Sequence, residues 1–130
     1  MVVALLALAT PAAMAGRMAP IEDVVDAPVV WTSKAPADLD VVQGTILMAL
    51  IKRGSTSQLP SPGLIPAAFQ KDTHRIEGDM PYDTKAHSIR YRASTDMLYD
   101  QTKGEIHRKY DEGVRALQRS IDPEMVRVGP

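Results

Sequence analysis

Apolar residues recur at intervals of three and four positions between residues 39 and 53 of the chain. This spacing is close to the 3.6-residue period of an α-helix, so the segment is predicted to be a helix with one apolar face. Gly54 follows it and can adopt the left-handed conformation that commonly ends a helix. The residues of the apolar face are Leu39, Val42, Ile46 and Leu50.

A longer stripe with the same period predicts a second helix near the C-terminus. Thr102 and Glu105 have the spacing of a capping box, which favours a helix start just before the stripe. Asp122 precedes Pro123, and because a residue before proline avoids the helical region, the helix is expected to end there. The stripe consists of Ile106, Tyr110, Val114, Leu117 and Ile121.

Between the two predicted helices, apolar and polar residues alternate, which indicates β-strands. The segments 74–80 and 87–92 show this alternation and are predicted to pair as a hairpin. The apolar run 64–69 is a third strand candidate, and 55–61 is a weak fourth.

The register of the hairpin follows from placing apolar partners on one face of the sheet. Pairing Ile76 with Ile89 puts His87 opposite Gly78 and leaves residues 81–84 as a four-residue loop. Such loops are commonly built on a type I turn.

The predicted fold is a two-layer α+β sandwich spanning residues 38–122. Consecutive short strands between two helices favour an antiparallel meander of three or four strands. Both helices are expected to pack on one face of this sheet, in the order α-β-β-β-α.

The segments that flank the predicted domain differ from it in composition. Residues 1–15 are apolar and uncharged, and a small-x-small pattern precedes Gly16, which is typical of a signal peptide. This segment is too short to span a bilayer, which needs about 20 residues. Residues 16–37 contain three prolines and are predicted to be an extended arm, and residues 123–130 are predicted to be a flexible tail.

The signal segment predicts an exported protein, with the periplasm of a Gram-negative bacterium as the expected location. The mature chain would begin near Gly16. Because no cysteine stands at the cleavage point, no lipid anchor is expected, and the mature protein is predicted to be soluble.

The composition fits one folded domain and argues against several classes of function. Of the 130 residues, 45% are hydrophobic, which is enough to form a core. The net charge is −1, whereas a nucleic-acid-binding protein usually carries a clear basic excess, so no nucleic-acid partner is expected. The chain has no cysteine, which excludes disulfides, thiolate zinc sites and cysteine nucleophiles.

The predicted register separates the residues that could carry chemistry. His74 and His87 would lie roughly 13 Å apart along the hairpin, too far to share a metal ion. His107 lies on the second predicted helix, beside its apolar stripe. Ser88 and His87 are neighbours on a strand and point to opposite faces, so they cannot form a catalytic dyad. No catalytic residue, metal site or cofactor is therefore expected.

Two segments carry a combined motif that resembles a known family. Within the hairpin, the motif starts with Asp79-Met80-Pro81-Tyr82 and finishes with Ser88-Ile89-Arg90-Tyr91. The second predicted helix contains Ile106-His107 followed by Tyr110. This combination resembles a family of small bacterial exported proteins and lipoproteins of uncharacterised function. The resemblance implies an α+β fold behind a signal sequence and no established activity.

The chain departs from the pattern of that family at two positions. Members often carry tryptophan where this chain has Ser55 and Gly113. Losing one buried tryptophan costs about 3–5 kcal/mol if the site cannot collapse, and losing two is easier to tolerate if their rings normally touch. We therefore hypothesise that Ser55 and Gly113 face the same space and leave a shallow apolar groove.

Basic and aromatic residues near the hairpin suggest a binding surface made of Tyr82, Arg90, Arg92 and Tyr99. The two arginines are expected on the solvent face of their strand. We expect a non-enzymatic binding or interaction module of the cell envelope, whose partner is an envelope protein or an anionic envelope polymer.

Two alternative functions stay open. The first is a small hydrolase or metal-dependent enzyme that uses His87, Asp83 and Tyr82. The second is a purely structural component of the envelope or of a stress response.

Overall fold

The computed structural model of the chain describes residues 16–30 and 38–128. The predicted signal segment 1–15 lies outside the described residues, as do residues 31–37 of the predicted arm and the last two residues. Within the described ranges the chain is α+β, with two helices and a mostly antiparallel sheet. The sequence periodicities predicted this class.

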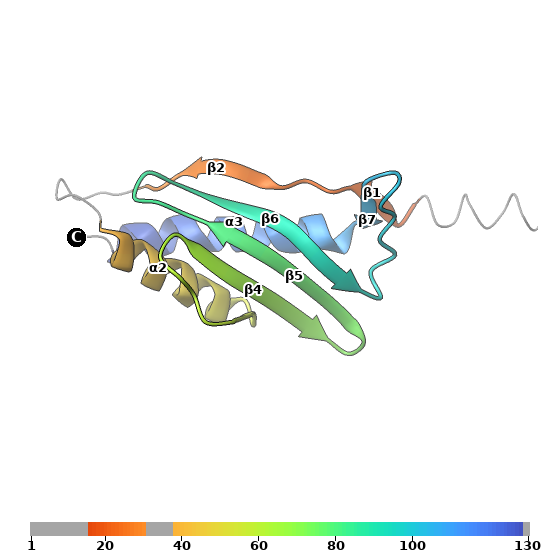
Figure 1. Ribbon diagram of the computed structural model, residues 1–130, viewed down its shortest axis with the longest axis horizontal. Coiled ribbons are helices and arrows are strands. Elements are labelled where there is room, and N and C mark those ends of the chain that lie inside the picture. Colours follow the sequence, from red (N-terminus) through yellow and green to blue (C-terminus); the bar gives the residue numbers. More distant parts are fainter. Residues whose placement is uncertain (1–15, 31–37, 129–130) are drawn as a thin grey trace, which may run out of the picture.

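Seven strands form within the described ranges. Five make one antiparallel sheet in the order β2-β6-β5-β4-β3, and β1 pairs with β7 beside it (Figure 1). The strands are β1 (Met18–Pro20), β2 (Val24–Pro28), β3 (Thr56–Ser57), β4 (Leu64–Lys71), β5 (His74–Pro81), β6 (Ala86–Thr95) and β7 (Glu105–His107).

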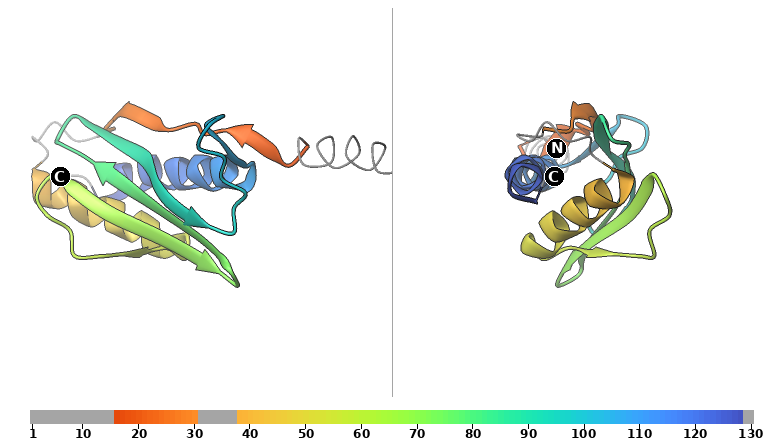
Figure 2. Two further views of the ribbon diagram at one scale, coloured as in Figure 1. Left: turned by 45° about the vertical axis from the view of Figure 1, so that its right-hand side comes forward. Right: turned by 90° about the vertical axis from the view of Figure 1, so that its left-hand side faces the viewer.

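Helices α2 (Leu39–Lys52) and α3 (Lys109–Val128) pack against each other on the same side of the sheet (Figure 2). Asp38 caps α2, because its carboxylate accepts the Val41 N–H at 2.8 Å. Side chains from both helices and from four strands make one core. They include Val42, Ile46 and Leu50 of α2, Tyr110, Val114, Ile121 and Met125 of α3, and Ile65, Met80, Ile89 and Ile106 of the strands.

The N-terminal arm contributes strands to the fold. The observed order therefore differs from the predicted α-β-β-β-α, since β1 and β2 precede α2 and β7 stands between β6 and α3. Long-range backbone pairing is the reason, because β1 pairs with β7 and β2 pairs with β6. Pro20 and Pro28 are the last residues of their strands, a position where the missing N–H of proline is tolerated.

The hairpin of β5 and β6 forms as predicted, but its register is wrong by four residues next to the turn and by five beyond a β-bulge between Glu77 and Gly78. Gly78 lies opposite Tyr91 and not opposite His87, which instead faces Tyr82. A shift by four residues leaves the alternation of inward and outward side chains unchanged, so the apolar pattern could not exclude it. The turn fixes the register, since the Asp83 carboxylate accepts the N–H groups of Lys85 and Ala86, both at 2.7 Å.

Helix α3 begins later than predicted. The segment Glu105–His107, which was expected in the first turn, is strand β7 and pairs with β1. Glu105 and Thr102 therefore do not form a capping box. The helix starts at Lys109, whose N–H donates to His107 Nδ1 at 3.1 Å.

Helix α3 also ends later than predicted. It continues through Pro123 to Val128, so the predicted flexible tail is helical as far as Val128. Packing explains the extension, because the Met125 side chain is fully buried and Glu124 forms an ion pair with Lys52 of α2. Tertiary contacts of this kind outweigh the local penalty of proline.

A buried carboxylate ties the arm to the first turn of α3. Asp111 is only 3% exposed and accepts the Glu22 N–H at 2.9 Å, while Glu22 pairs with Arg115 at 3.2 Å. Burial raises the pKa of Asp111, although the Glu22 N–H and the charge of Arg115 act in the opposite direction.

We expect the substitution Met125→Ala to lower the free energy of unfolding by about 2–5 kcal/mol, because it leaves a hole in the core. Val126 is 42% exposed and provides the matched control. Val126→Ala should change stability by about 0.5 kcal/mol or less. Urea denaturation measures both values, and equal effects of the two substitutions would show that the end of α3 is not packed.

The raised pKa of Asp111 predicts a pH-dependent stability. Because the folded pKa lies above the unfolded value of about 3.9, this group stabilises the fold most below pH 4, and the contribution is lost as pH rises through the folded pKa. Asp111→Asn keeps an acceptor for Glu22 and should remove this dependence. Urea midpoints from pH 4 to 7 compare it with the wild type and with Glu112→Gln, an exposed control in the same turn. Parallel profiles for all three proteins would contradict the assignment.

Candidate ligand-binding cavity

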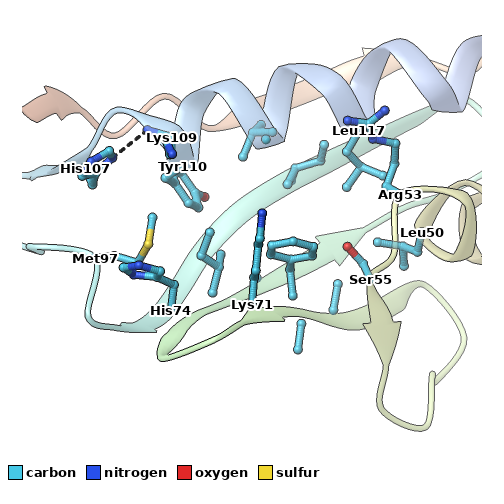
Figure 3. Close-up of a pocket in the computed structure, with 18 of the residues that line it drawn as sticks. Leu50, Arg53, Ser55, Lys71, His74, Met97, His107, Lys109, Tyr110 and Leu117 are labelled. Atoms are coloured by element: carbon cyan, nitrogen blue, oxygen red, sulfur yellow. Dashed lines mark hydrogen bonds between the residues drawn. The ribbon is translucent and has the colours of Figure 1, made fainter. Parts of the chain in front are cut away.

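A cavity of about 450 Å³ opens between α3, the C-terminal end of α2 and strands β4 and β5 (Figure 3). This volume is typical of sites for small molecules, which measure about 300–1,000 Å³. Most of the lining is apolar and comes from both helices and from the sheet. It includes Leu50, Ala68, Ile76, Met80, Val114 and Leu117.

Two small residues lie on the wall of this cavity. Gly113 is on α3, and no neighbouring heavy atom lies within 4 Å of the position that a Cβ would take there. Ser55 follows α2 and lines the same space from the other side. The structure therefore places both residues of the groove hypothesis along one cavity.

Three cationic side chains that line the cavity have no carboxylate partner among the described residues. Arg53, Lys71 and Lys109 are exposed, and none of them forms an ion pair within the described part of the chain. The one carboxylate among the lining residues is Asp72. The lining thus carries an excess of positive charge at neutral pH.

Two of the three histidines, His74 and His107, line this cavity. They lie on separate predicted elements, and the sequence did not predict that they share a site. The His74 Nδ1–H donates to the Asp96 carbonyl at 2.6 Å. His107 Nδ1 accepts the Lys109 N–H, so in the neutral ring the proton is on Nε2 (Figure 3). Burial lowers the pKa of His107, and the charges of Lys109, Arg108 and Arg17 lower it further.

Tyr110 brings an unpaired polar group to the cavity wall. Its side chain extends from α3 toward the sheet and is 2% exposed (Figure 3). The hydroxyl has no hydrogen-bond partner within the described ranges. Burial raises the pKa of Tyr110, and the charges of Asp23 and Asp111 add to this effect, so the hydroxyl keeps its proton.

The predicted hairpin surface is separate from the cavity. Arg90, Arg92 and Tyr99 are exposed, whereas Tyr82 is buried and its hydroxyl accepts a hydrogen bond from Gln43 Nε2 at 3.0 Å. Arg92 is paired with two carboxylates of β5. Tyr99 lies 4.8 Å from Tyr91, measured between ring centroids. Tyr82 and Arg90 line a second, smaller pocket of about 170 Å³.

The three residues of the enzyme alternative have different hydrogen-bond partners. His87 is buried, and its Nε2 lies 2.7 Å from Gln118 Oε1 on α3. Asp83 holds the hairpin turn, and the N–H groups of Lys85 and Ala86 lower its pKa. Tyr82 lies opposite His87 on the neighbouring strand, and its hydroxyl binds Gln43. No group of three metal-ligating side chains occurs within residues 16–30 and 38–128.

The chain matches no family model, no curated protein and no solved structure. Among the described residues, no helix is long and apolar enough to cross a membrane. The functional argument therefore rests on the geometry of the cavity.

Sequence reasoning missed most of the polar residues that line the cavity. Tyr110 was assigned to the apolar stripe of a helix, and neither Tyr110 nor Lys71 carries a local signal of a site. Lys71 and Tyr110 line one cavity because α3 lies across the sheet from β4, and these two elements are far apart in the chain. Gly113 carried the one available signal, because a glycine in the middle of an amphipathic helix is unfavourable by about 1 kcal/mol.

The electrostatics of the cavity predict that Lys109→Met raises the pKa of His107. The substitution removes a nearby positive charge but keeps the backbone N–H that binds Nδ1. The pKa should stay below the ordinary value of about 6.5, because burial is the larger cause. NMR titration of the imidazole measures the shift, and Arg119→Met on the same helix provides the control. Equal shifts in the two variants would contradict a local effect of Lys109.

Proposed function

We propose that the protein is a non-enzymatic binding module of the cell envelope that holds a small, largely apolar molecule in the cavity beneath α3. The observation that carries this proposal is an open cavity of about 450 Å³ with an apolar lining drawn from both helices and the sheet. A ligand that covers this lining gains hydrophobic free energy of about 25 cal/mol per Å² of apolar surface removed from water.

The cavity supports this function better than the hairpin surface does. Arg92 already has carboxylate partners, and Tyr82 is buried against α2, so neither is available to an incoming molecule. The cavity, in contrast, combines a concave apolar lining with a few polar groups, which is the usual composition of a small-molecule site. A location in the envelope is supported by the apolar, uncharged segment 1–15 and by the resemblance to exported proteins.

A neutral fluorescent probe and a cavity-filling substitution test the proposal. N-phenyl-1-naphthylamine, which brightens in apolar surroundings, should bind the wild-type protein. Gly113→Leu should weaken this binding by about tenfold or more, equivalent to about 1.4 kcal/mol, because the new side chain occupies the cavity. Fluorescence titration measures the affinity.

Gly44→Leu is the matched control for that experiment. Gly44 is also an exposed helical glycine with no heavy atom within 4 Å of a new Cβ, but it lies on α2 and does not line the cavity. Both substitutions replace a helical glycine and should stabilise their helices by about 0.5–1 kcal/mol. Only Gly113→Leu should weaken binding of the probe. Unchanged affinity in both variants would place the probe elsewhere and refute the proposed site.

A further inference from the structure

The two ends of the cavity differ in chemistry. At one end, Figure 3 places Leu50, Ser55 and Leu117 beside the C-terminal end of α2, with Arg53 at the edge. At the other end, beside β7 and the start of α3, it places a group of polar side chains. We call this the polar end, and it consists of Lys71, His74, His107, Lys109 and Tyr110.

Four groups at the polar end, Lys71, His107, Lys109 and Tyr110, can donate a hydrogen bond to a ligand, whereas the Nδ1–H of His74 is already bonded to the Asp96 carbonyl. Lys71 and Lys109 carry positive charges that no carboxylate within the described ranges neutralises. His107 carries its proton on Nε2 because Nδ1 accepts the Lys109 N–H. The start of α3 adds the positive end of a helix dipole. Asp72 is the one carboxylate in the lining, and behind the lining the Asp96 carboxylate lies 3.5 Å from His74 Nδ1, while the charges of Asp23 and Asp111 act on Tyr110.

The Tyr110 hydroxyl is the strongest indication of a missing partner. A buried hydroxyl without a hydrogen bond is unfavourable by about 1–3 kcal/mol, so such groups are rare in folded proteins. Tyr110 is 2% exposed, and its oxygen has no partner within residues 16–30 and 38–128. A ligand oxygen at the polar end would accept this hydrogen bond.

We propose that the ligand is an amphipathic anion, an alkyl chain that ends in a carboxylate or a phosphate group. Its oxygens lie at the polar end, where they accept the Tyr110 O–H and pair with Lys71 and Lys109. Its chain runs over the apolar lining toward Leu50 and Leu117. This inference rests on the proposed function, because it assumes that the cavity is the binding site.

Three ligands with the same alkyl chain test the charge requirement. Dodecanoate, dodecyl phosphate and dodecanol are titrated by calorimetry, each below its aggregation concentration. The two anions should bind roughly 10- to 100-fold more tightly than the alcohol, because hydrogen bonds to charged groups are the stronger ones. Tighter binding of dodecanoate identifies a fatty acid as the source of the head group, and tighter binding of dodecyl phosphate identifies a phosphate monoester.

The outcomes of these titrations separate the two proposals. If dodecanol binds as tightly as the anions and Gly113→Leu weakens all three, the anionic head group is refuted while the proposed function stands. If none of the three ligands binds and the neutral probe does not bind either, both proposals are refuted.

Tyr110→Phe distinguishes a ligand-binding hydroxyl from a structural one. The variant should bind dodecanoate roughly 12- to 160-fold more weakly, the effect of losing one hydrogen bond to a charged group. Binding of N-phenyl-1-naphthylamine should not change. The melting temperature should stay the same or rise, because the substitution removes an unpaired buried hydroxyl. A lower melting temperature with unchanged affinity for dodecanoate would refute the assigned role.

Two lysine variants and one arginine control locate the head group. Lys71→Gln and Lys109→Gln should each weaken binding of dodecanoate, and the loss should shrink as salt is added, since both lysines are exposed. Arg53→Gln removes a charge of the same sign from the opposite end and should leave the affinity nearly unchanged. An equal or larger loss in Arg53→Gln would refute the proposed orientation.

Discussion

The rest of the structure depends on the contacts that hold helix α3 in place at both of its ends. At its start, the Arg108 N–H donates to the Arg17 carbonyl at 2.8 Å, and Asp111 accepts the Glu22 N–H at 2.9 Å. At its far end, the Met125 side chain is buried in the core, and the ion pair between Lys52 and Glu124 adjoins it. The helix is therefore held by the N-terminal arm on one side and by α2 on the other, two segments that are distant in the sequence.

This double attachment explains why a cavity persists beneath the helix. When a large core side chain is replaced by a small one, the neighbouring residues normally move into part of the empty space. The loss of stability is smaller the more completely they fill it. Helix α3 cannot move toward β4 without breaking the contacts at one of its ends. Gly113 lies between the two attachments, where it adds no side chain to fill the space. The apolar lining thus stays accessible.

Local patterns predicted the elements of this fold but not the contacts that arrange them. The apolar stripes identified both helices, and alternation identified the hairpin, because these periods depend on neighbouring residues alone. The register of the hairpin was wrong because, next to the turn, a shift of four residues preserves the alternation, and the hydrogen bonds of Asp83 decide it. A β-bulge between Glu77 and Gly78 then adds a fifth residue, which the alternation did not reveal. The pairing of β1 with β7 has no local signal, so residues 105–107 were assigned to a helix. The same limit applies to the cavity, whose polar end joins β4 with α3.

The polar end combines two kinds of donor that act at different distances. Lys71 and Lys109 are exposed, so they keep much of their hydration, and their charges attract an anion from solution more than they orient it. The Tyr110 hydroxyl is shielded from water, where a hydrogen bond is stronger and an unmade one is costly. A phenylalanine would fill the same apolar site without that cost. In the proposed binding mode, the hydroxyl destabilises the empty protein and is satisfied when the oxygen of a ligand accepts its hydrogen bond.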